Sequence, residues 1–462
     1  MILDLKYFEW LEKKVKIIYY YITRYGIEHI NFKFSPEALK QEPNKENFFN
    51  SVHEGFEQAQ EEIIQALLIF DDKLAELKSE NKNLRLKKLL IESKGLKKIN
   101  LTLKYHELVF RKLADSIAWQ LMNMEKYRVR RLMINTYPTP IKNINLKSTN
   151  DVIRWLKIYY PNSFALITDI TTFVHIGDLL VFDFKNSRSY FVELKSGIVN
   201  EEIFKMIESF NPKDSSNNFK LFDSFFANDE NGKTYKQLNR VIGQDRKAAN
   251  VISIFKNDKG IDNQSGNEIK IFNCDFKINY FSNRIQNLFL KSQHNNSATT
   301  TIDECLLVGL YNSQFFGRKA MEMWLMLKKI KPYPVFNYIQ GFYDPTAFPP
   351  FLQPIDPNFI EELVFLKKHL FFVLDFDEWL IKAKIIGFEF RWLTKKQTIK
   401  VLQDRKKSHK PFIFEDQALE FSYKKNKALL EQGILARIFY DWITPISALK
   451  LLKSLINKTY KK

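Results

Sequence analysis

Cysteine is scarce in this chain of 462 residues, which contains only Cys274 and Cys305. The two cysteines lie in different parts of the sequence, and neither has a Cys-x-x-Cys partner or a histidine-rich segment beside it. Such scarcity excludes a disulfide framework and a cysteine-ligated zinc site. We therefore expect a cytoplasmic protein, because a reducing compartment suits a chain without disulfides.

Long apolar runs and several familiar motifs are also missing. The N-terminal stretch MILDLKYFEWLEKKVK mixes acids and lysines with apolar residues, and the most apolar later stretch is interrupted by Lys367, Lys368 and Asp375. Neither resembles a signal peptide or a membrane-spanning helix, so the sequence predicts no membrane partner. It also contains no GxxxxGK loop, no GxSxG motif and no kinase motif set.

Positive charge is what the chain has in excess. Lysine and arginine number 71 against 53 for aspartate and glutamate, which gives a formal net charge of +18. This surplus favours a polyanionic partner such as nucleic acid, through counterion release and electrostatic steering. AT-biased coding also produces lysine-rich chains, so the basic composition alone leaves both explanations open.

The length predicts two or three domains, of which the first, residues 1–104, has a helical pattern. Apolar residues recur there in steps of three and four, with Asn81 and Lys88 interrupting the series: Ile63, Leu67, Phe70, Leu74, Leu77, Leu84 and Ile91. The stripe is compatible with a coiled coil. A long amphipathic helix packed on its own domain explains it better, because the stripe is short and interrupted.

The rest of the chain divides into a predicted α/β region at residues 105–290, a polar linker at 291–301 and a C-terminal domain at 302–462. Within the α/β region, the sequence pattern predicts a helix, three strands, a second helix and a further strand. In chain order these are the segments 150–160, 163–173, 178–184, 189–195, 234–255 and 268–276. The C-terminal domain is mixed and rich in aromatic residues, and a role in substrate or partner recognition is one interpretation.

Two acids and a lysine occupy strand positions where apolar residues are expected. Strand side chains alternate between faces, so Glu193 and Lys195 share one face, and a hairpin through residues 185–189 returns Glu193 towards Asp178. Two carboxylates held close together repel each other unless a cation lies between them, and hard oxygen ligands favour Mg²⁺ or Mn²⁺. A phosphodiester suits such a site, because a divalent cation polarises the phosphoryl oxygen and activates water.

The acid Asp178, the 15-residue offset and the triplet Glu193-Leu194-Lys195 resemble the motif of the PD-(D/E)xK nuclease superfamily, over roughly residues 105–290. The resemblance implies an α/β, restriction-endonuclease-like core, which is a mixed central sheet flanked by helices. It also implies that Asp178, Glu193 and the Leu194 carbonyl bind the metal, and that Lys195 acts on the attacking water. Gly177 stands where the family name has proline.

The same resemblance points to further residues. Gln237, with Lys236 beside it, lies in the helix after the third strand, where family members add a glutamine or a basic residue to the catalytic set, so the resemblance implies a catalytic role for Gln237. Glu107 is the best candidate for a further metal-binding acid, although it lies 71 residues before Asp178. We expect basic residues near the cleft to contact phosphates, namely Lys236, Arg240 and Arg246. His175 and the basic cluster at 404–410 are weaker candidates.

The resulting hypothesis is a metal-dependent endonuclease that cleaves nucleic acid, with DNA favoured over RNA because DNA is the common substrate in the family. Prokaryotic restriction or phage defence is the setting this suggests, with a homo-oligomer or an activating partner protein as further options. Two alternatives stay open. One is a catalytically silent nuclease fold that serves as a binding scaffold, and the other is a helical interaction protein that uses the stripe at 63–91.

Overall fold

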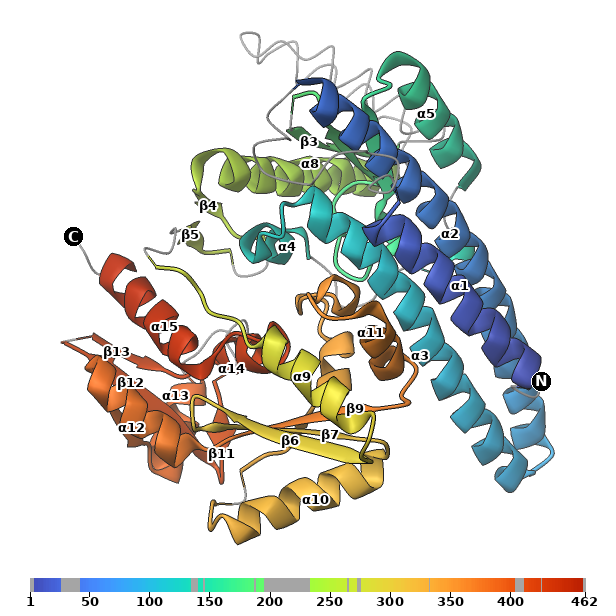
Figure 1. The fold of residues 1–462 in the computed structure, drawn as a ribbon. Coiled ribbons are helices and arrows are strands. Elements are labelled where there is room, and N and C mark those ends of the chain that lie inside the picture. Colours follow the sequence, from blue (N-terminus) through green and yellow to red (C-terminus); the bar gives the residue numbers. More distant parts are fainter. Residues whose placement is uncertain are drawn as a thin grey trace. The chain divides into compact units, whose positions relative to one another are not determined.

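The computed structural model describes residues 4–25, 42–133, 140–143, 146–186, 188–194, 233–263, 266–271, 276–331, 333–403, 411–424 and 426–459. The fold is mixed α/β with helices predominating (Figure 1), which confirms the predicted class at this level. The chain divides into two compact units, Met1–Lys270 and Ile271–Lys462, each described separately below. No helix within the described ranges is long and apolar enough to cross a membrane.

Three long helices begin the first unit: α1 (Leu5–Thr23), α2 (Glu42–Leu86) and α3 (Leu90–Leu121). Asp4 caps α1, because its carboxylate accepts a hydrogen bond from the Tyr7 backbone N–H at 2.9 Å. Helix α2 packs against both α1 and α3, and its stripe residues Ile63 and Leu67 are fully buried. The stripe therefore packs within its own unit, whereas Ile91 belongs to α3 and is 83% exposed.

The remaining elements of the first unit include a small antiparallel sheet with the strand order β1-β2-β3. The described helices and strands are α4 (Lys126–Leu132), η2 (Ile141–Asn143), α5 (Leu146–Tyr159), β1 (Ser163–Ile167), η3 (Thr168–Ile170), β2 (Leu179–Asp183), β3 (Arg188–Val192), α8 (Lys233–Asn257), β4 (Lys259–Ile261) and β5 (Glu268–Lys270). The register pairs Ile167 with Leu179 and Leu179 with Val192.

Helix α2 covers the edge of this sheet. The Gln60 side chain accepts a hydrogen bond from the Ile167 N–H at 2.8 Å and donates one to the Ala165 carbonyl at 3.1 Å. These bonds satisfy backbone groups that an edge strand otherwise leaves unpaired. Strand β1 is consequently fixed to α2, and it can in turn position β2 and β3.

Several boundaries differ from the sequence prediction. The order of α5, three strands, α8 and β5 agrees with it, but every strand pair in the described ranges is antiparallel, and β4 pairs with β5. The mixed central sheet is therefore not seen there. The expected boundary at 104/105 falls inside the continuous helix α3, because the apolar pattern extends through it.

The predicted linker at 291–301 was wrong, because it contains the end of α9 (Ser282–Ser292) and most of β6 (Ser297–Ile302). The unit boundary lies at 270/271 instead. Strand β6 alternates buried Ala298 and Ile302 with exposed serine and threonine. A half-exposed edge strand of this kind has the polar composition of a linker, which explains the error.

The second unit contains two antiparallel sheets, with strand orders β6-β7-β9-β8 and β10-β12-β11, and β13 pairs with β12. Its other elements are β7 (Leu306–Tyr311), α10 (Gln314–Leu327), β8 (Phe336–Asn337), η4 (Tyr338–Tyr343), η5 (Pro350–Leu352), α11 (Pro357–Val364), β9 (His369–Leu374), α12 (Phe376–Ile386), β10 (Glu389–Trp392), α13 (Lys395–Gln403), β11 (Ile413–Phe414), β12 (Gln417–Tyr423), β13 (Asn426–Leu429), α14 (Gln432–Phe439) and α15 (Pro445–Thr459).

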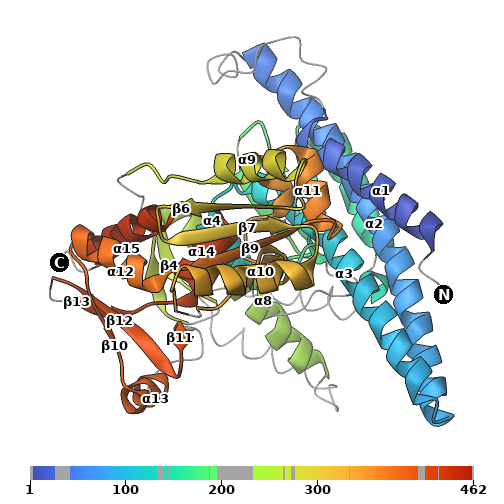
Figure 2. The ribbon, with the colours of Figure 1, turned by 60° about the horizontal axis from the view of Figure 1, so that its bottom comes forward.

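Strands β7 and β9 form the centre of the larger sheet and are buried along their whole length. Helices α9 and α10 lie on opposite sides of this sheet (Figure 1 and Figure 2). Two glycines permit the close approach of α10, because a Cβ on Gly309 would lie 2.7 Å from the Met321 sulfur and one on Gly317 would lie 2.5 Å from the Phe371 ring. The inner face of α10 is therefore buried against this sheet.

Candidate active site

Gly177 determines how the chain enters β2 and therefore where Asp178 lies. Its φ of +70° is in the left-handed region, and an added Cβ would lie 2.9 Å from the Val192 carbonyl oxygen. Proline cannot adopt this backbone conformation, because its ring holds φ near −65°. This backbone consequently requires glycine, and not proline, before Asp178.

The backbone around Asp178 departs from regular strand pairing. Its N–H donates to the Val192 carbonyl at 2.8 Å, although Val192 is the register partner of Leu179. Two residues of one strand thus face one residue of the other, as in a β-bulge, a feature that changes the direction of side chains. On the other side, the Thr168 N–H donates to the Asp178 carbonyl at 3.0 Å.

The hairpin brings Asp178 to the predicted triplet. The Asp178 carboxylate accepts a hydrogen bond from the N–H of Leu194, which belongs to the peptide that joins Glu193 to Leu194. Asp178 and Glu193 are both partly buried. The structure therefore places the Asp178 carboxylate beside the Glu193–Leu194 peptide, whereas Lys195 lies outside the described residues.

The donor set fits a hard divalent cation. Two carboxylates and the Leu194 carbonyl are oxygen donors of the kind that Mg²⁺ and Mn²⁺ bind, and Mg²⁺ commonly keeps several waters and uses only one or two carboxylates. Across the described ranges, no group of three or more His, Cys, Asp or Glu side chains gathers in a way that could hold a metal. A site here would accordingly depend on Asp178, Glu193 and the backbone.

Glu107 has a different environment from the one predicted for a metal ligand. It lies on α3 and accepts a hydrogen bond from Arg111 Nε at 2.8 Å. Arg111 is almost fully buried, and its guanidinium also donates to the Asp169 carbonyl at 2.7 Å. Glu107 thus stabilises the arginine that fixes α3 to η3.

The predicted phosphate-binding residues all belong to α8. Arg240 and Arg246 are exposed and Gln237 is partly buried, while the side chain of Lys236 lies outside the described residues. The C-terminal end of helix α8 packs on β3, where the ring centroids of Phe255 and Phe191 are 6.5 Å apart. With a rise of about 1.5 Å per residue, Arg246 lies roughly 13 Å along the axis from Phe255 and Gln237 roughly 27 Å.

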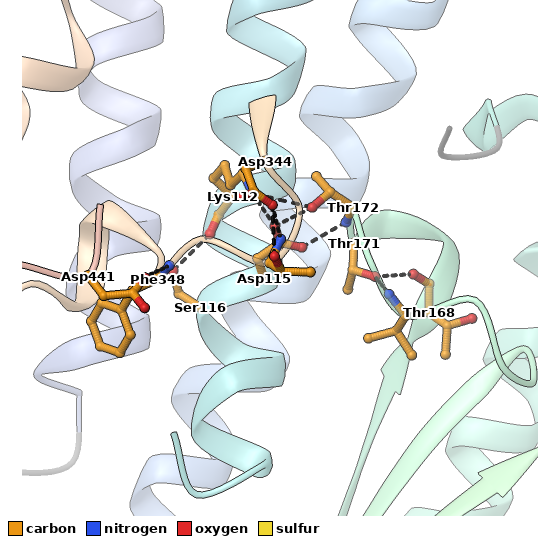
Figure 3. Close-up of polar contacts among 11 residues, drawn as sticks. Lys112, Asp115, Ser116, Thr168, Thr171, Thr172, Asp344, Phe348 and Asp441 are labelled. Carbon is orange, nitrogen blue, oxygen red and sulfur yellow. Dashed lines mark hydrogen bonds and ion pairs between the residues drawn. The ribbon is translucent and has the colours of Figure 1, made fainter. Parts of the chain in front are cut away.

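The sequence interpretation missed a buried polar network next to the candidate site. Lys112 and Asp115 on α3 are at most 1% exposed, and Lys112 Nζ lies 3.1 Å from an Asp115 carboxylate oxygen. Asp115 also accepts hydrogen bonds from the Thr172 N–H at 2.7 Å and from its hydroxyl at 2.5 Å (Figure 3). The signal in the sequence was a pair of opposite charges three residues apart, Lys112 and Asp115, among the apolar residues of the helix.

This network supports the loop that presents Asp178. Next to Thr172, the Thr171 hydroxyl donates to the Thr168 carbonyl at 2.7 Å (Figure 3). The Thr168 hydroxyl in turn donates to the Gly177 carbonyl at 2.6 Å. Helix α3 is thereby connected, through three threonines, to the backbone on which Asp178 is carried.

His175 is the one weaker candidate of the sequence analysis that lies within the described residues. Burial lowers the pKa of His175 more than the nearby charge of Asp115 raises it, so the imidazole is neutral near pH 7. The His175 N–H donates to the Leu132 carbonyl at 3.0 Å, which fixes its backbone to the end of α4. The basic cluster at 404–410 lies outside the described residues.

Comparison with known proteins found no relative: the chain matches no protein-family model, no curated protein and no solved structure. Together, the fold and the site define an α/β protein whose first unit holds two acids at a bulged hairpin. Any functional assignment therefore depends on the chemistry of those residues.

Proposed function

We propose that the chain is a metal-dependent nuclease with a restriction-endonuclease-like core, which hydrolyses phosphodiester bonds in nucleic acid, with DNA favoured over RNA. The observation that supports this most directly is the hydrogen bond between the Asp178 carboxylate and the Leu194 N–H. It joins the two halves of the predicted motif across the hairpin. The order of α5, three strands, α8 and β5 supports the same proposal.

Each motif residue has a separate duty in this proposal. Asp178, Glu193 and the Leu194 carbonyl would hold Mg²⁺ or Mn²⁺, which supplies Lewis-acid activation of the phosphoryl group and of water. Lys195 would orient the attacking water or stabilise charge on the phosphoryl oxygens. Gln237 would join the catalytic residues, and Arg240 and Arg246, with Lys236, would contact the phosphate backbone. The setting we propose is restriction or phage defence in the cytoplasm.

Replacement of Asp178 by asparagine tests this function most sharply. Asparagine keeps an oxygen that accepts the Leu194 N–H but removes the negative charge that a cation needs. We expect Asp178→Asn to lose Mn²⁺ binding in calorimetry and to cleave plasmid DNA at least on the order of a hundredfold more slowly than the wild type. Glu193→Gln should behave alike, and Lys195→Ala should keep the metal and lose cleavage.

Asp183→Asn is the matched control, because Asp183 lies at the other end of β2 and its carboxylate accepts hydrogen bonds from the turn residue Asn186, at 2.6 Å and 3.1 Å. It should keep both metal binding and cleavage. Mn²⁺ binding that is equal in the wild type and in Asp178→Asn would instead favour the catalytically silent scaffold.

A further inference from the structure

The outer face of α10 carries an unusual concentration of exposed apolar side chains. Its inner face, with Gly317, Met321 and Leu325, is buried against the sheet. On the opposite side, five large apolar residues are more than 60% exposed: Phe315 at 68%, Phe316 at 71%, Met323 at 62%, Met326 at 76% and Leu327 at 79%. A contiguous exposed apolar face of this kind marks an interaction surface.

The outer face consists of two parallel rows of side chains. One row is Phe315, Lys319, Glu322 and Met326, and the other is Phe316, Ala320, Met323 and Leu327. In both rows the spacing is four, three and four residues, so the spacing within each row is the same in either direction along the helix. A surface with this symmetry can match a reversed copy of itself.

We propose that α10 is a self-association surface, on which two copies of this chain pair their α10 helices antiparallel about a two-fold axis. In such a pair, residues equally far from the helix centre face each other. Phe315 then faces Met326 of the other copy. The second row is centred one residue further along the helix, so Phe316 lies between Met323 and Leu327 of the other copy. Every large exposed side chain thus gains an apolar neighbour, and methionine packs favourably against aromatic rings.

The charges in the first row also match. Within one chain, Lys319 Nζ lies 2.9 Å from Glu322, and Arg318 Nε lies 3.2 Å from the same carboxylate. Reversal of the helix places Lys319 of one copy opposite Glu322 of the other, and the two-fold axis repeats this contact. Two reciprocal ion pairs thus form at the centre, and no like charges face each other in either row.

The expected strength follows from the size of the surface. A helix of 14 residues is about 21 Å long, and one pair of such helices buries less than the roughly 1,600 Å² of a standard interface. We therefore expect a reversible dimer with a Kd on the order of micromolar or weaker.

Sedimentation velocity of the full chain over a range of micromolar concentrations measures this association. The wild type should shift from monomer to dimer as its concentration rises, and Met323→Glu should weaken the dimer at least about tenfold by placing a charge in the apolar row. The control is Ile385→Glu on α12, which changes an equally apolar residue that is 81% exposed and should leave the dimer intact. A wild type that stays monomeric throughout, or a dimer that Met323→Glu does not weaken, would overturn the proposal.

A charge exchange separates pairing between copies from an effect on folding. Lys319→Glu alone and Glu322→Lys alone each place like charges across the two-fold axis, so each variant should associate less than the wild type. Mixed in equal amounts, the two variants should form a heterodimer with four complementary charges, because one supplies two acids and the other two lysines. If the mixture associates no better than either variant alone, α10 is not the surface that pairs.

Discussion

At the residue scale, the candidate site depends on one glycine as much as on its acids. Gly177 adopts a positive φ, and the Val192 carbonyl occupies the space where a side chain would begin. The same turn gives Asp178 its two-to-one pairing with Val192 and brings its carboxylate to the Leu194 N–H. The position of Asp178, which we propose as a metal ligand, is thus determined by the residue before it.

Replacement of Gly177 by alanine should therefore destabilise the first unit. Left-handed backbone disfavours L-residues by roughly 1–2 kcal/mol, and the close carbonyl adds to this, so we expect a loss of about 1–3 kcal/mol in urea unfolding. Gly243→Ala is the control, because Gly243 lies inside α8 with no atom within 4 Å of its added Cβ. It should be neutral or stabilise by roughly 0.5–1 kcal/mol. Equal effects at the two glycines would contradict this account.

Sequence analysis can find those site residues whose proximity is determined by a local pattern. The acid–triplet motif placed Asp178, Glu193 and Leu194 together because a short hairpin determines their proximity. The burial of Lys112 and Asp115 arises from packing between distant segments. The apolar pattern of α3 does not indicate that Thr172 is their partner. The motif was therefore predictable, whereas its support was not.

At the element scale, α3 and the loop from η3 to β2 act as one support for the site. They meet at the buried carboxylate of Asp115, which pairs with Lys112 on the same helix and accepts hydrogen bonds from Thr172 of the loop. Removal of one member of a buried pair leaves an unpaired charge in the interior, which typically destabilises a protein by about 3–5 kcal/mol. Loss of this contact should also displace the loop that presents Asp178.

Asp115→Ala should consequently lower the free energy of unfolding by about 3–5 kcal/mol, and at temperatures where the fold persists it should weaken Mn²⁺ binding at Asp178. Asp151→Ala offers a control with the same i,i+3 spacing, because the Arg154–Asp151 pair is 78% and 59% exposed and 3.8 Å apart. That change should stay within roughly 0.5 kcal/mol of the wild type. A loss in Asp115→Ala as small as in the control would mean that the network does not support the fold.

The elements themselves were predictable to different degrees. The order α5, β1, β2, β3 and α8 followed from helical periodicity and from short apolar runs typical of strands, which local sequence determines. Strand β6 did not, because its serine and threonine residues are typical of a loop, and only pairing with β7 makes them a strand. The predicted 104/105 boundary was wrong for a related reason, because one continuous helix can contact different parts of the protein along its length.

At the scale of the whole molecule, the chain has two units and a large positive charge. The net charge of +18 favours contact with a polyanion, but it does not indicate which unit makes that contact. The salt dependence of binding, measured on variants of each unit, can locate the surface. The reason is that each phosphate contact releases counterions, and the number of contacts sets the slope of log K against log salt.

The nuclease proposal predicts that binding of a DNA duplex weakens steeply between low and moderate salt. If Arg240 and Arg246 each contact a phosphate, the double change to glutamine should reduce the slope by about 2, which is roughly one per contact. The control is Lys396→Gln with Lys400→Gln, which removes the same two charges from exposed positions on α13 in the second unit. The slope should then stay close to that of the wild type. An equal reduction in the control would assign phosphate contacts to the second unit as well, and affinity that does not change with salt would rule out nucleic acid as the substrate.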